Sequence, residues 1–317
     1  MSMPAPVIEN AREALLAKLQ CPLTGRELRV DGSSLVTTDG SRRYRLSPSG
    51  VALFGEAWLS EDGAVQRTHY DRIAGIYTGN LAYAHTREYV AYFDRALLQT
   101  IDRVNLREVA EICCGAGEGL RLLDSRVELG VGVDVSTAML EAARRSIPAQ
   151  TRLFVQGDAV RLPLADAQFD TVIMLGGIHH VNDRGALFRE VRRILRPGGA
   201  FVWREPVDDF WLWRTLRQAI YRWSPTLEAD TEHPLRLAAT KTQLEQAGLE
   251  LDTWRTLGFI GYCFLMNGDV LAINRVWNYI PGSRALARIA ARVDDWSLRV
   301  PGLSMSGPIA VGLAWRR

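Results

Sequence analysis

The sequence predicts an α/β fold in which a mostly parallel sheet of seven strands carries helices on both faces. Two observations support this prediction. From Val109 onward, apolar segments of strand length alternate with segments of helical periodicity. The strand segments are apolar throughout, which is typical of parallel strands buried on both faces. A small β unit is expected before this region, and a helical cap is expected over it.

The first sixty residues differ in character from the rest of the chain. Residues 7–20 predict a short amphipathic helix. Residues 21–56 hold short strand-like runs separated by Thr-Gly, Asp-Gly and Pro-Ser-Gly turn signals, which predict two or three hairpins. We interpret residues 57–80 as a connector and residues 81–103 as a helix. The predicted domains are an N-terminal helix with a small β unit over 1–60 and a main domain over 61–317.

The alternating region gives the main domain its expected elements. Ser136 is the expected N-cap of the helix after the second strand. The helix over 183–195 is expected to stop at Arg-Pro-Gly-Gly, because proline and glycine do not comfortably continue a helix. Strands are expected at 109–114, 129–134, 152–156, 169–175, 200–205, 249–258 and 308–317.

Two insertions, near 207–238 and 258–307, are expected to form the helical cap, because they exceed plain connections. Eight of the nine tryptophans follow residue 200, and Arg284, Arg288 and Arg292 recur every four residues. These features fit three interpretations: amphipathic helices with solvated faces, a cap over an apolar acceptor pocket, or peripheral contact with a membrane.

Composition limits the classes of function. The net charge is +2 and no concentrated basic face is evident, so a nucleic-acid partner is not expected. The four cysteines include no CxxC pair, and we expect no metal. No apolar run has the length of a signal peptide or a membrane span, so we expect a cytoplasmic protein. The oligomeric state stays open.

A glycine-rich turn follows the first strand of the main domain. It reads Glu111-Ile-Cys-Cys-Gly-Ala-Gly-Glu-Gly119, and it opens a helix whose N–H groups are available to a ligand. Its third glycine comes one residue too early for a dinucleotide fingerprint. Asp134 ends the second strand, Asp158 and Ala159 follow the third, and His179 and His180 follow the fourth. These strand ends should meet at one edge of the sheet, where ligands of open α/β sheets bind.

With these motifs the chain resembles the class I S-adenosylmethionine-dependent methyltransferases, which have a Rossmann-like fold, and in particular their ubiquinone/menaquinone-biosynthesis and small-metabolite branch. The resemblance covers about residues 67–257 and rests on EICCGAGEG, GVDVS, GDAVRLPLADAQFD, HHV and LRPGG. It implies S-adenosyl-L-methionine as cofactor. It assigns the methionine part to Glu111 and to Gly115 through Gly117, the ribose to Asp134, and the adenine to Asp158 and Ala159, and it counts Val135 among the cofactor-binding residues.

Several residues of this region have competing interpretations. The family usually has glycine where Cys113 stands, which suggests a tighter pocket or a weaker cofactor affinity; Cys113 and Cys114 are otherwise expected to be small core residues. Glu118 is expected to be a surface acid favoured by the helix dipole. His179 and His180 are candidates for a base that takes a proton from a phenol or amine, or they are structural histidines. Tyr70 and Tyr77 are candidates for bounding the acceptor cavity.

The favoured function is methyl transfer to an O, N or C atom of a mid-sized, partly apolar metabolite, as in secondary metabolism. One alternative is an RNA methyltransferase, because residues 21–56 resemble the activator-subunit domain of RNA and protein methyltransferases, although only Cys21 of a metal set is kept. Against it, no Asn/Asp-Pro-Pro-Tyr/Phe motif follows the fourth strand. The other alternative is a non-catalytic scaffold subunit that keeps the cofactor fold.

Overall fold

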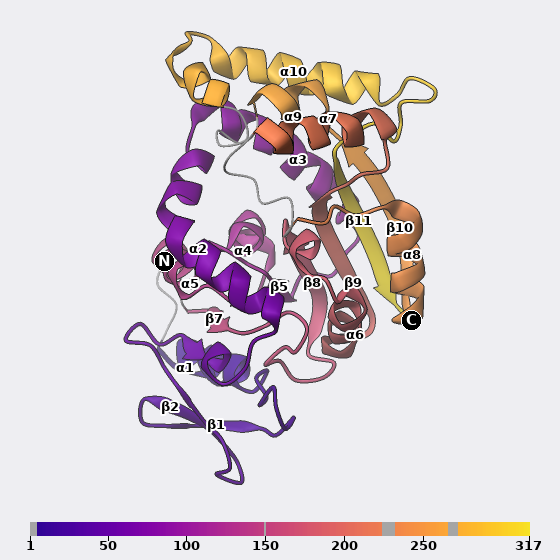
Figure 1. The fold of residues 1–317 in the computed structure, drawn as a ribbon. Helices are drawn as coiled ribbons and strands as arrows, with labels where there is room; N and C mark the ends of the chain where they lie inside the picture. Colours follow the sequence, from indigo (N-terminus) through magenta and orange to yellow (C-terminus); the bar gives the residue numbers. More distant parts are fainter. Residues whose placement is uncertain (1–4, 149, 224–231, 266–271) are drawn as a thin grey trace.

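A sheet of eight strands forms the centre of the protein (Figure 1). The structure is a computed structural model, and it describes residues 5–148, 150–223, 232–265 and 272–317. The strand order is β10-β11-β9-β8-β5-β6-β7-β4. The strands are β4 (Ala52–Leu53), β5 (Glu108–Ile112), β6 (Leu129–Asp134), β7 (Arg152–Gln156), β8 (Phe169–Leu175), β9 (Leu195–Pro206), β10 (Leu249–Leu257) and β11 (Ile309–Arg316).

The direction of the strands confirms the predicted Rossmann-like class. Strands β4 to β9 run parallel to their neighbours, and β11 is antiparallel to both β9 and β10. From β5 the chain builds outward through β6 and β7, then crosses back to β8 on the other side. The order therefore reverses between β5 and β8, and a crevice is expected at the carboxyl ends of these strands.

The eighth strand is a difference from the seven that the sequence predicts. Strand β4 pairs in parallel with β7, with Ala52 opposite Val155 and Leu53 opposite Gln156. We had assigned this short apolar run to the separate β unit. The apolar pattern of this run predicts a strand. It does not indicate which strand the run pairs with, because pairing between distant strands depends on tertiary packing.

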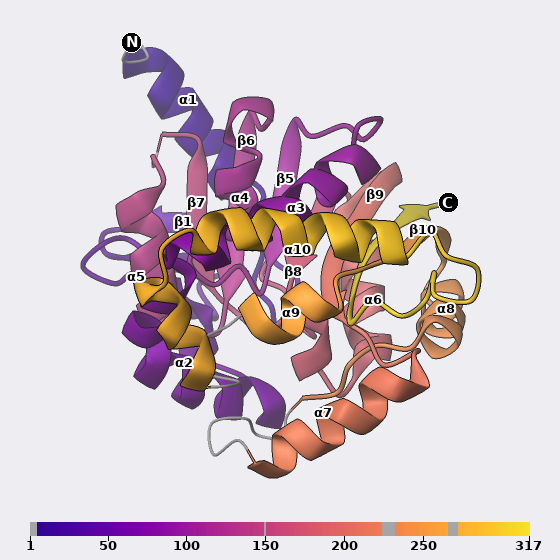
Figure 2. The same cartoon turned by 90° about the horizontal axis from the view of Figure 1, so that it is seen from above.

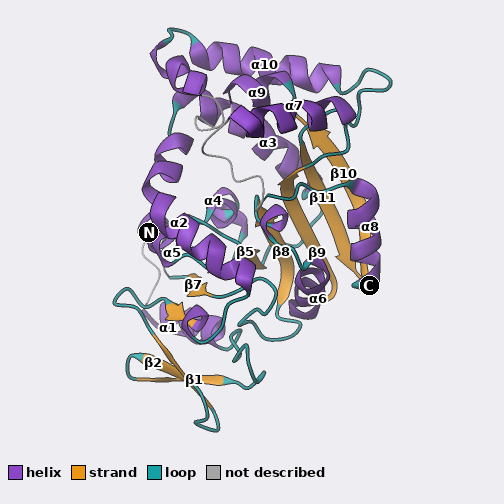
Figure 3. Cartoon of the chain, in the orientation of Figure 1, coloured by secondary structure: helices purple, strands orange, loops and turns teal. Residues whose placement is uncertain are grey.

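Helices cover both faces of the sheet (Figure 3). Side chains of α1, α6 and α8 share one hydrophobic cluster with one face. Side chains of α3, α4, α5 and α10 share a second cluster with the other face. Ser136 caps α5 as predicted, its hydroxyl accepting from Met139 N at 3.2 Å. The helices are α1 (Ala5–Leu16), α3 (Ala84–Thr100), α4 (Glu118–Leu122), α5 (Thr137–Ser146), α6 (Arg184–Ile194), α8 (Leu237–Gln246) and α10 (Ser283–Ser297).

Residues 61–81 form a helix, so most of the segment interpreted as a connector is helical. Helix α2 (Glu61–Leu81) begins after Ser60, whose hydroxyl accepts from Gly63 N at 3.0 Å. Two acids, Glu61 and Asp62, occupy its first turn, where their negative charge interacts favourably with the helix dipole. This start signal was present in the sequence. Three glycines and a weak apolar periodicity concealed the helix behind it.

The N-terminal unit packs against the main sheet. Strands β1 (Leu28–Asp31), β2 (Ser34–Thr37) and β3 (Arg43–Arg45) form an antiparallel sheet of two hairpins, and a 3-10 turn (Phe54–Glu56) follows β4. The Sγ of Cys21 lies 2.9 Å from the Tyr44 hydroxyl, and both residues belong to the hydrophobic cluster that includes Phe169. The division of the chain at residue 60 stays a prediction.

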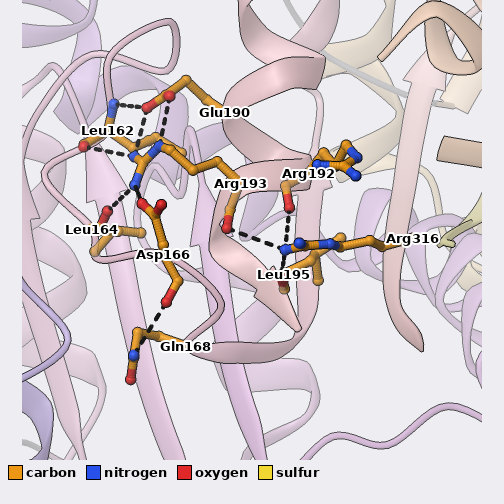
Figure 4. Close-up of polar contacts among 9 residues, drawn as sticks. All are labelled: Leu162, Leu164, Asp166, Gln168, Glu190, Arg192, Arg193, Leu195 and Arg316. Carbon is orange, nitrogen blue, oxygen red and sulfur yellow. Dashed lines mark hydrogen bonds and ion pairs between the residues drawn. The ribbon is translucent and has the colours of Figure 1, made fainter. Parts of the chain in front are cut away.

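Charged side chains close the carboxyl end of α6 (Figure 4). Arg316, from the last strand, donates from Nη1 to the carbonyl of Arg192 at 2.9 Å and also to that of Leu195. Arg193 binds Glu190 and Asp166 and donates to the carbonyl of Leu164 at 2.6 Å. Arg316 thus satisfies carbonyls that the end of the helix leaves free, while Arg193 ties the helix to the loop after β7. Helix α6 ends at Ile194, just before the predicted Arg-Pro-Gly-Gly signal.

The cap lies at one end of the sheet (Figures 1 and 2). Its elements are α7 (Trp211–Trp223), α9 (Ile260–Leu265), the 3-10 helix η4 (Ala272–Tyr279) and α10. They follow the carboxyl ends of β9 and β10, which run in the same direction, so the cap lies at the edge that holds the predicted crevice. Among the described residues, every helix is too short or too polar to cross a bilayer.

Buried contacts hold the cap together. The Tyr89 hydroxyl of α3 donates to Asp294 Oδ2 of α10 at 2.5 Å, and Gly261 N donates to the same oxygen at 2.8 Å. Trp213 is buried against the rings of Phe259 and Tyr262. Trp213 is therefore a packing residue of the cap, whereas the side chain of Trp223 lies outside the described part.

Candidate functional site

The turn after β5 adopts an unusual backbone. Gly115 and Gly117 have φ of +50° and +77°, in the left-handed region that favours glycine. Cys113 has φ of +52°, so it keeps the conformation expected of a glycine while carrying a side chain. Burial raises the pKa of its thiol well above the usual value, which keeps the thiol neutral. Cys113 lines a cleft, whereas Cys114 is buried in the core as expected.

Glu111 supports this turn from below. Its Oε1 accepts from Gly119 N at 2.7 Å and its Oε2 from Leu120 N at 2.9 Å. Burial raises the pKa of Glu111 to about 8, against the lowering effect of these two N–H groups. Neither Glu111 nor Gly117 lines the cleft. The geometry therefore gives Glu111 a role in positioning the start of α4 and lends no support to direct contact with a cofactor.

Asp134 lies at the tip of β6, at the centre of the site. Its Oδ2 accepts from Gly115 N and its Oδ1 from Ser136 N, both at 2.8 Å. Burial raises the pKa of Asp134 to about 6, although these N–H groups oppose the rise. The carboxylate thus couples the glycine turn to the end of β6. Asp134 and Val135 both line the cleft.

Asp158 and Ala159, after β7, also line the cleft. Asp158 Oδ2 accepts from Ser60 N at 2.8 Å and from the Ser60 hydroxyl at 2.7 Å, while Oδ1 accepts from Val160 N at 3.0 Å. Each oxygen of a carboxylate has two acceptor positions, so Oδ1 retains one for a ligand. Asp158 therefore also anchors the first turn of α2.

Helix α2 crosses the cleft and is called the lid helix below. In addition to Ser60, its Asp62 accepts from Asn182 N at 3.0 Å and from the Asn182 side-chain amide at 2.6 Å. Farther along, Asp71 Oδ1 accepts from the Ser136 hydroxyl at 2.6 Å and from Ala138 N at 3.1 Å. The lid helix is thus tied to the ends of three strands. The resemblance to similar enzymes, in which the segment around Tyr70 folds over the cofactor as a lid, indicates a lid here, but the sequence gives no sign of these individual contacts.

The predicted histidines follow β8 and have different environments. His179 is buried, and its Nδ1 lies 2.8 Å from Glu205 Oε2. His180 lines the cleft, and its Nε2 lies 3.1 Å from the Tyr70 hydroxyl of the lid helix. The two histidine rings pack together with centroids 3.9 Å apart. His180 is therefore placed to meet a ligand, while His179 is held by a buried carboxylate.

Glu205, near the end of β9, is a residue that sequence reasoning missed. It is fully buried, and its Oε1 accepts from Gly177 N at 2.7 Å and Ile178 N at 2.9 Å. Together with its contact to His179, these bonds fix the loop that carries His180. A single acid in a strand gives no local signal of such a role, because its partners come from another strand.

The cleft has the lining of a small-molecule site. It lies at the crevice between β5 and β8, and mainly apolar side chains with a few polar groups line it. Tyr70 lines it as predicted, and burial raises the pKa of its hydroxyl, which therefore stays neutral. The side chain of Tyr77 lies outside the described part. The apolar wall consists of Ile112, Val133, Val135, Met139, Val160, Leu175 and Val181.

Glu118 is a further member of the cleft, so its expected place on the surface is wrong. Burial raises the pKa of Glu118, and its Oε1 accepts no hydrogen bond from the described part of the chain. A buried carboxylate oxygen without a donor is costly unless a ligand supplies one. Its place beside Gly115 suits a cationic group such as the ammonium of a bound amino acid.

Comparisons with known proteins identify this region. A family profile described as a methyltransferase domain matches residues 110–203. A demethylmenaquinone methyltransferase from Mycolicibacterium paratuberculosis is 39% identical over 110 residues, which are 30% of this chain and 46% of that protein. A 27-O-demethylrifamycin SV methyltransferase from Amycolatopsis mediterranei is 36% identical over 107 residues, 32% of this chain and 38% of that protein. The chain spans about half the length, or less, of the curated relatives that it matches.

Solved structures agree on the fold. A SAM-dependent methyltransferase from Thermotoga maritima aligns with a TM-score of 0.52 at 17% identity, covering 78% of this chain and 98% of that one. This chain also aligns with one chain of the complex between the Haloferax volcanii Trm112 methyltransferase activator and a proposed methyltransferase. The TM-score is 0.54 at 17% identity, and the alignment covers 79% of this chain and 96% of that chain. The matched family implies S-adenosylmethionine as cofactor. Residues 110–203 therefore match a methyltransferase domain, and the chain shares the Rossmann-like fold of solved SAM-dependent methyltransferases.

Proposed function

We propose that the protein transfers a methyl group from S-adenosylmethionine to an O, N or C atom of a mid-sized, partly apolar metabolite. The observation that carries this proposal is the cleft at the strand switch point, which combines buried carboxylates with an apolar wall. The names of similar proteins support the class of acceptor: they include methyltransferases of demethylmenaquinone, of 2-phytyl-1,4-beta-naphthoquinone and of 27-O-demethylrifamycin SV.

The residues of the cleft fit the three parts of the cofactor. Asp134 and Val135 would hold the ribose, and Asp158 with Ala159 would hold the adenine, as the family resemblance implies. The fit is supported by Glu118, whose unpartnered buried oxygen would receive the ammonium of the methionine part. When bound, S-adenosylmethionine supplies a methyl group on a sulfonium, with a neutral leaving group. The protein then has to hold the acceptor close and aligned.

We assign proton transfer to His180. Its ring lines the cleft, and a neutral histidine near pH 7 can accept the proton that a phenol or amine loses. Tyr70 stays neutral, so it serves as a hydrogen-bonding partner of His180 rather than as a base. Glu205 acts as a positioning residue, because it holds His179 and the backbone of the loop.

The proposal is tested by methyl transfer from labelled cofactor to quinols, phenols and amines, with transfer RNA and ribosomal RNA as separate acceptors. His180→Ala should lower turnover by about 100-fold or more, the range of a lost general base, with cofactor affinity unchanged. His233→Ala is the matched control, because its exposed ring does not line the cleft. Turnover in His180→Ala equal to that of the parent would exclude His180 as the base. Methylation of RNA and of no small acceptor would contradict the proposed class of acceptor.

A further inference from the structure

Helix α10 exposes a stripe of apolar side chains. Leu286, Ile289, Val293 and Trp296 are exposed by 43%, 54%, 44% and 66%. They recur at spacings of three and four residues, which places them on one face of the helix. Just before the helix, Val276, Tyr279 and Ile280 are exposed as well. A soluble protein rarely gathers several large exposed apolar residues on one helix without a partner for them.

The rest of the helix surface divides into two further sectors. At 100° per residue, Ser283, Ala287, Ala291 and Asp294 form the buried sector that packs against the cap. A sector of basic residues lies between the buried sector and the apolar stripe; it comprises Arg284, Arg288, Arg292 and Arg299. The acids that face it are Glu88, paired with Arg284 and Arg288, and Asp295, paired with Arg299. The basic sector therefore keeps an excess of positive charge.

We infer that α10 docks this protein onto an anionic lipid surface. Exposed apolar residues flanked by arginines are the pattern of a helix that lies in a membrane interface, with the apolar side chains inserted and the cations at the headgroups. Figures 1 and 2 show α10 as the outermost helix at its end of the molecule, where no other element of the described part covers it. The cap that carries it lies at the same edge of the sheet as the cleft.

Charge and size argue against a second copy of the chain as the occupant. In an antiparallel twofold contact along α10, the arginines of one copy would lie beside those of the other, which costs free energy. The exposed apolar set also has only seven residues, whereas a stable interface uses roughly 20–30 residues a side. A lipid surface has neither restriction. The inference is independent of the acceptor and of methyl transfer, because it concerns binding by a face outside the cleft.

The test is co-sedimentation of the full chain with vesicles of phosphatidylcholine, with and without phosphatidylglycerol. We expect binding to the mixed vesicles that weakens with salt, and weak binding to phosphatidylcholine alone. The double variant Ile289→Asp/Val293→Asp should bind at least about tenfold more weakly, because two inserted apolar side chains are replaced by anions. Val30→Asp is the matched control: Val30 is exposed by 47% on β1, at the opposite end of the molecule.

Circular dichroism spectra and melting temperatures of all variants establish that they fold. Absence of binding to either kind of vesicle overturns the inference, as does equal binding by the double variant and the parent. A parent that is dimeric by analytical ultracentrifugation, and that becomes monomeric in the double variant, would instead assign the stripe to self-association. Methyl transfer measured in detergent-free solution with a water-soluble acceptor reports on the proposed function separately, so the failure of one is not mistaken for the failure of the other.

Discussion

At the scale of single residues, Cys113 shows how the cleft tolerates a departure from the family pattern. Its left-handed backbone costs about 1–2 kcal/mol relative to glycine. The side chain of Cys113 fits because residue 177, which faces it, is a glycine: a Cβ at position 177 would lie only 2.5 Å from the Cβ of Cys113. The side chain thus fills space that a glycine pair would leave open. This supports the tighter pocket that the sequence suggested.

Substitutions at Cys113 should separate backbone strain from packing. Cys113→Gly relieves the strain but loses a packed thiol and makes the unfolded chain more flexible, so we expect the unfolding free energy to change by less than about 1 kcal/mol. Cys113→Val adds branching at a left-handed position and should destabilise by about 2 kcal/mol or more. Urea denaturation measures both. If valine were tolerated as well as glycine, the strain described here would be absent.

At the scale of elements, the lid helix determines how the cleft is closed. It contacts the loops after β6, β7 and β8 through Asp71, Ser60 and Tyr70 in turn. Each contact joins the helix to a residue at the ligand-binding edge. Binding and release of a cofactor should therefore be coupled to opening of this helix.

The contact of Asp71 tests this coupling. Asp71→Ala removes the acceptor of the Ser136 hydroxyl and of Ala138 N, a loss of about 1–3 kcal/mol from one anchor of the helix. We expect faster hydrogen–deuterium exchange over residues 61–81 and faster dissociation of the cofactor. Arg72→Ala, a change at the exposed neighbouring position, should leave both unchanged. Unaltered exchange in Asp71→Ala would show that this anchor does not hold the lid.

The sequence predicts elements well where the signal is local. The strand ends at Asp134 and near Asp158 agree with the prediction, because the signal, an apolar run followed by an acid, lies within a few neighbouring residues. The capping of α5 by Ser136 is equally local. Helix α2 was missed because its glycines weaken the periodicity, although Ser60 and two acids marked its start. Strand β4 was assigned to the wrong sheet because its pairing with β7 joins residues about one hundred positions apart.

At the scale of the whole molecule, the site is assembled from strands that the chain visits in a doubly wound order. The sequence predicts that order, since each strand and helix has its own pattern, and so it predicts which edge binds a ligand. It does not predict the contacts across the cleft. The Tyr70–His180 pair and the buried Glu205 join residues more than twenty positions apart, and they depend on how α2, β8 and β9 pack.

Calorimetric titration with S-adenosylmethionine measures directly whether the cofactor binds at Asp134. Asp134→Asn replaces an ionised acceptor, so we expect affinity to fall by about 10- to 100-fold, with Asp102→Asn, an exposed site, as an unaffected control.

The same titration should also depend on pH, and the raised pKa of Asp134 gives the direction in which cofactor affinity changes. Burial raises the pKa of Asp134 to about 6, so the carboxylate is ionised above this pH and takes up a proton below it. Binding to the parent protein should therefore weaken by about tenfold per unit as the pH falls below about 6, and Asp134→Asn should lose this part of the pH dependence. Absence of binding, or unchanged affinity in Asp134→Asn, would contradict the assignment of this cleft to the cofactor.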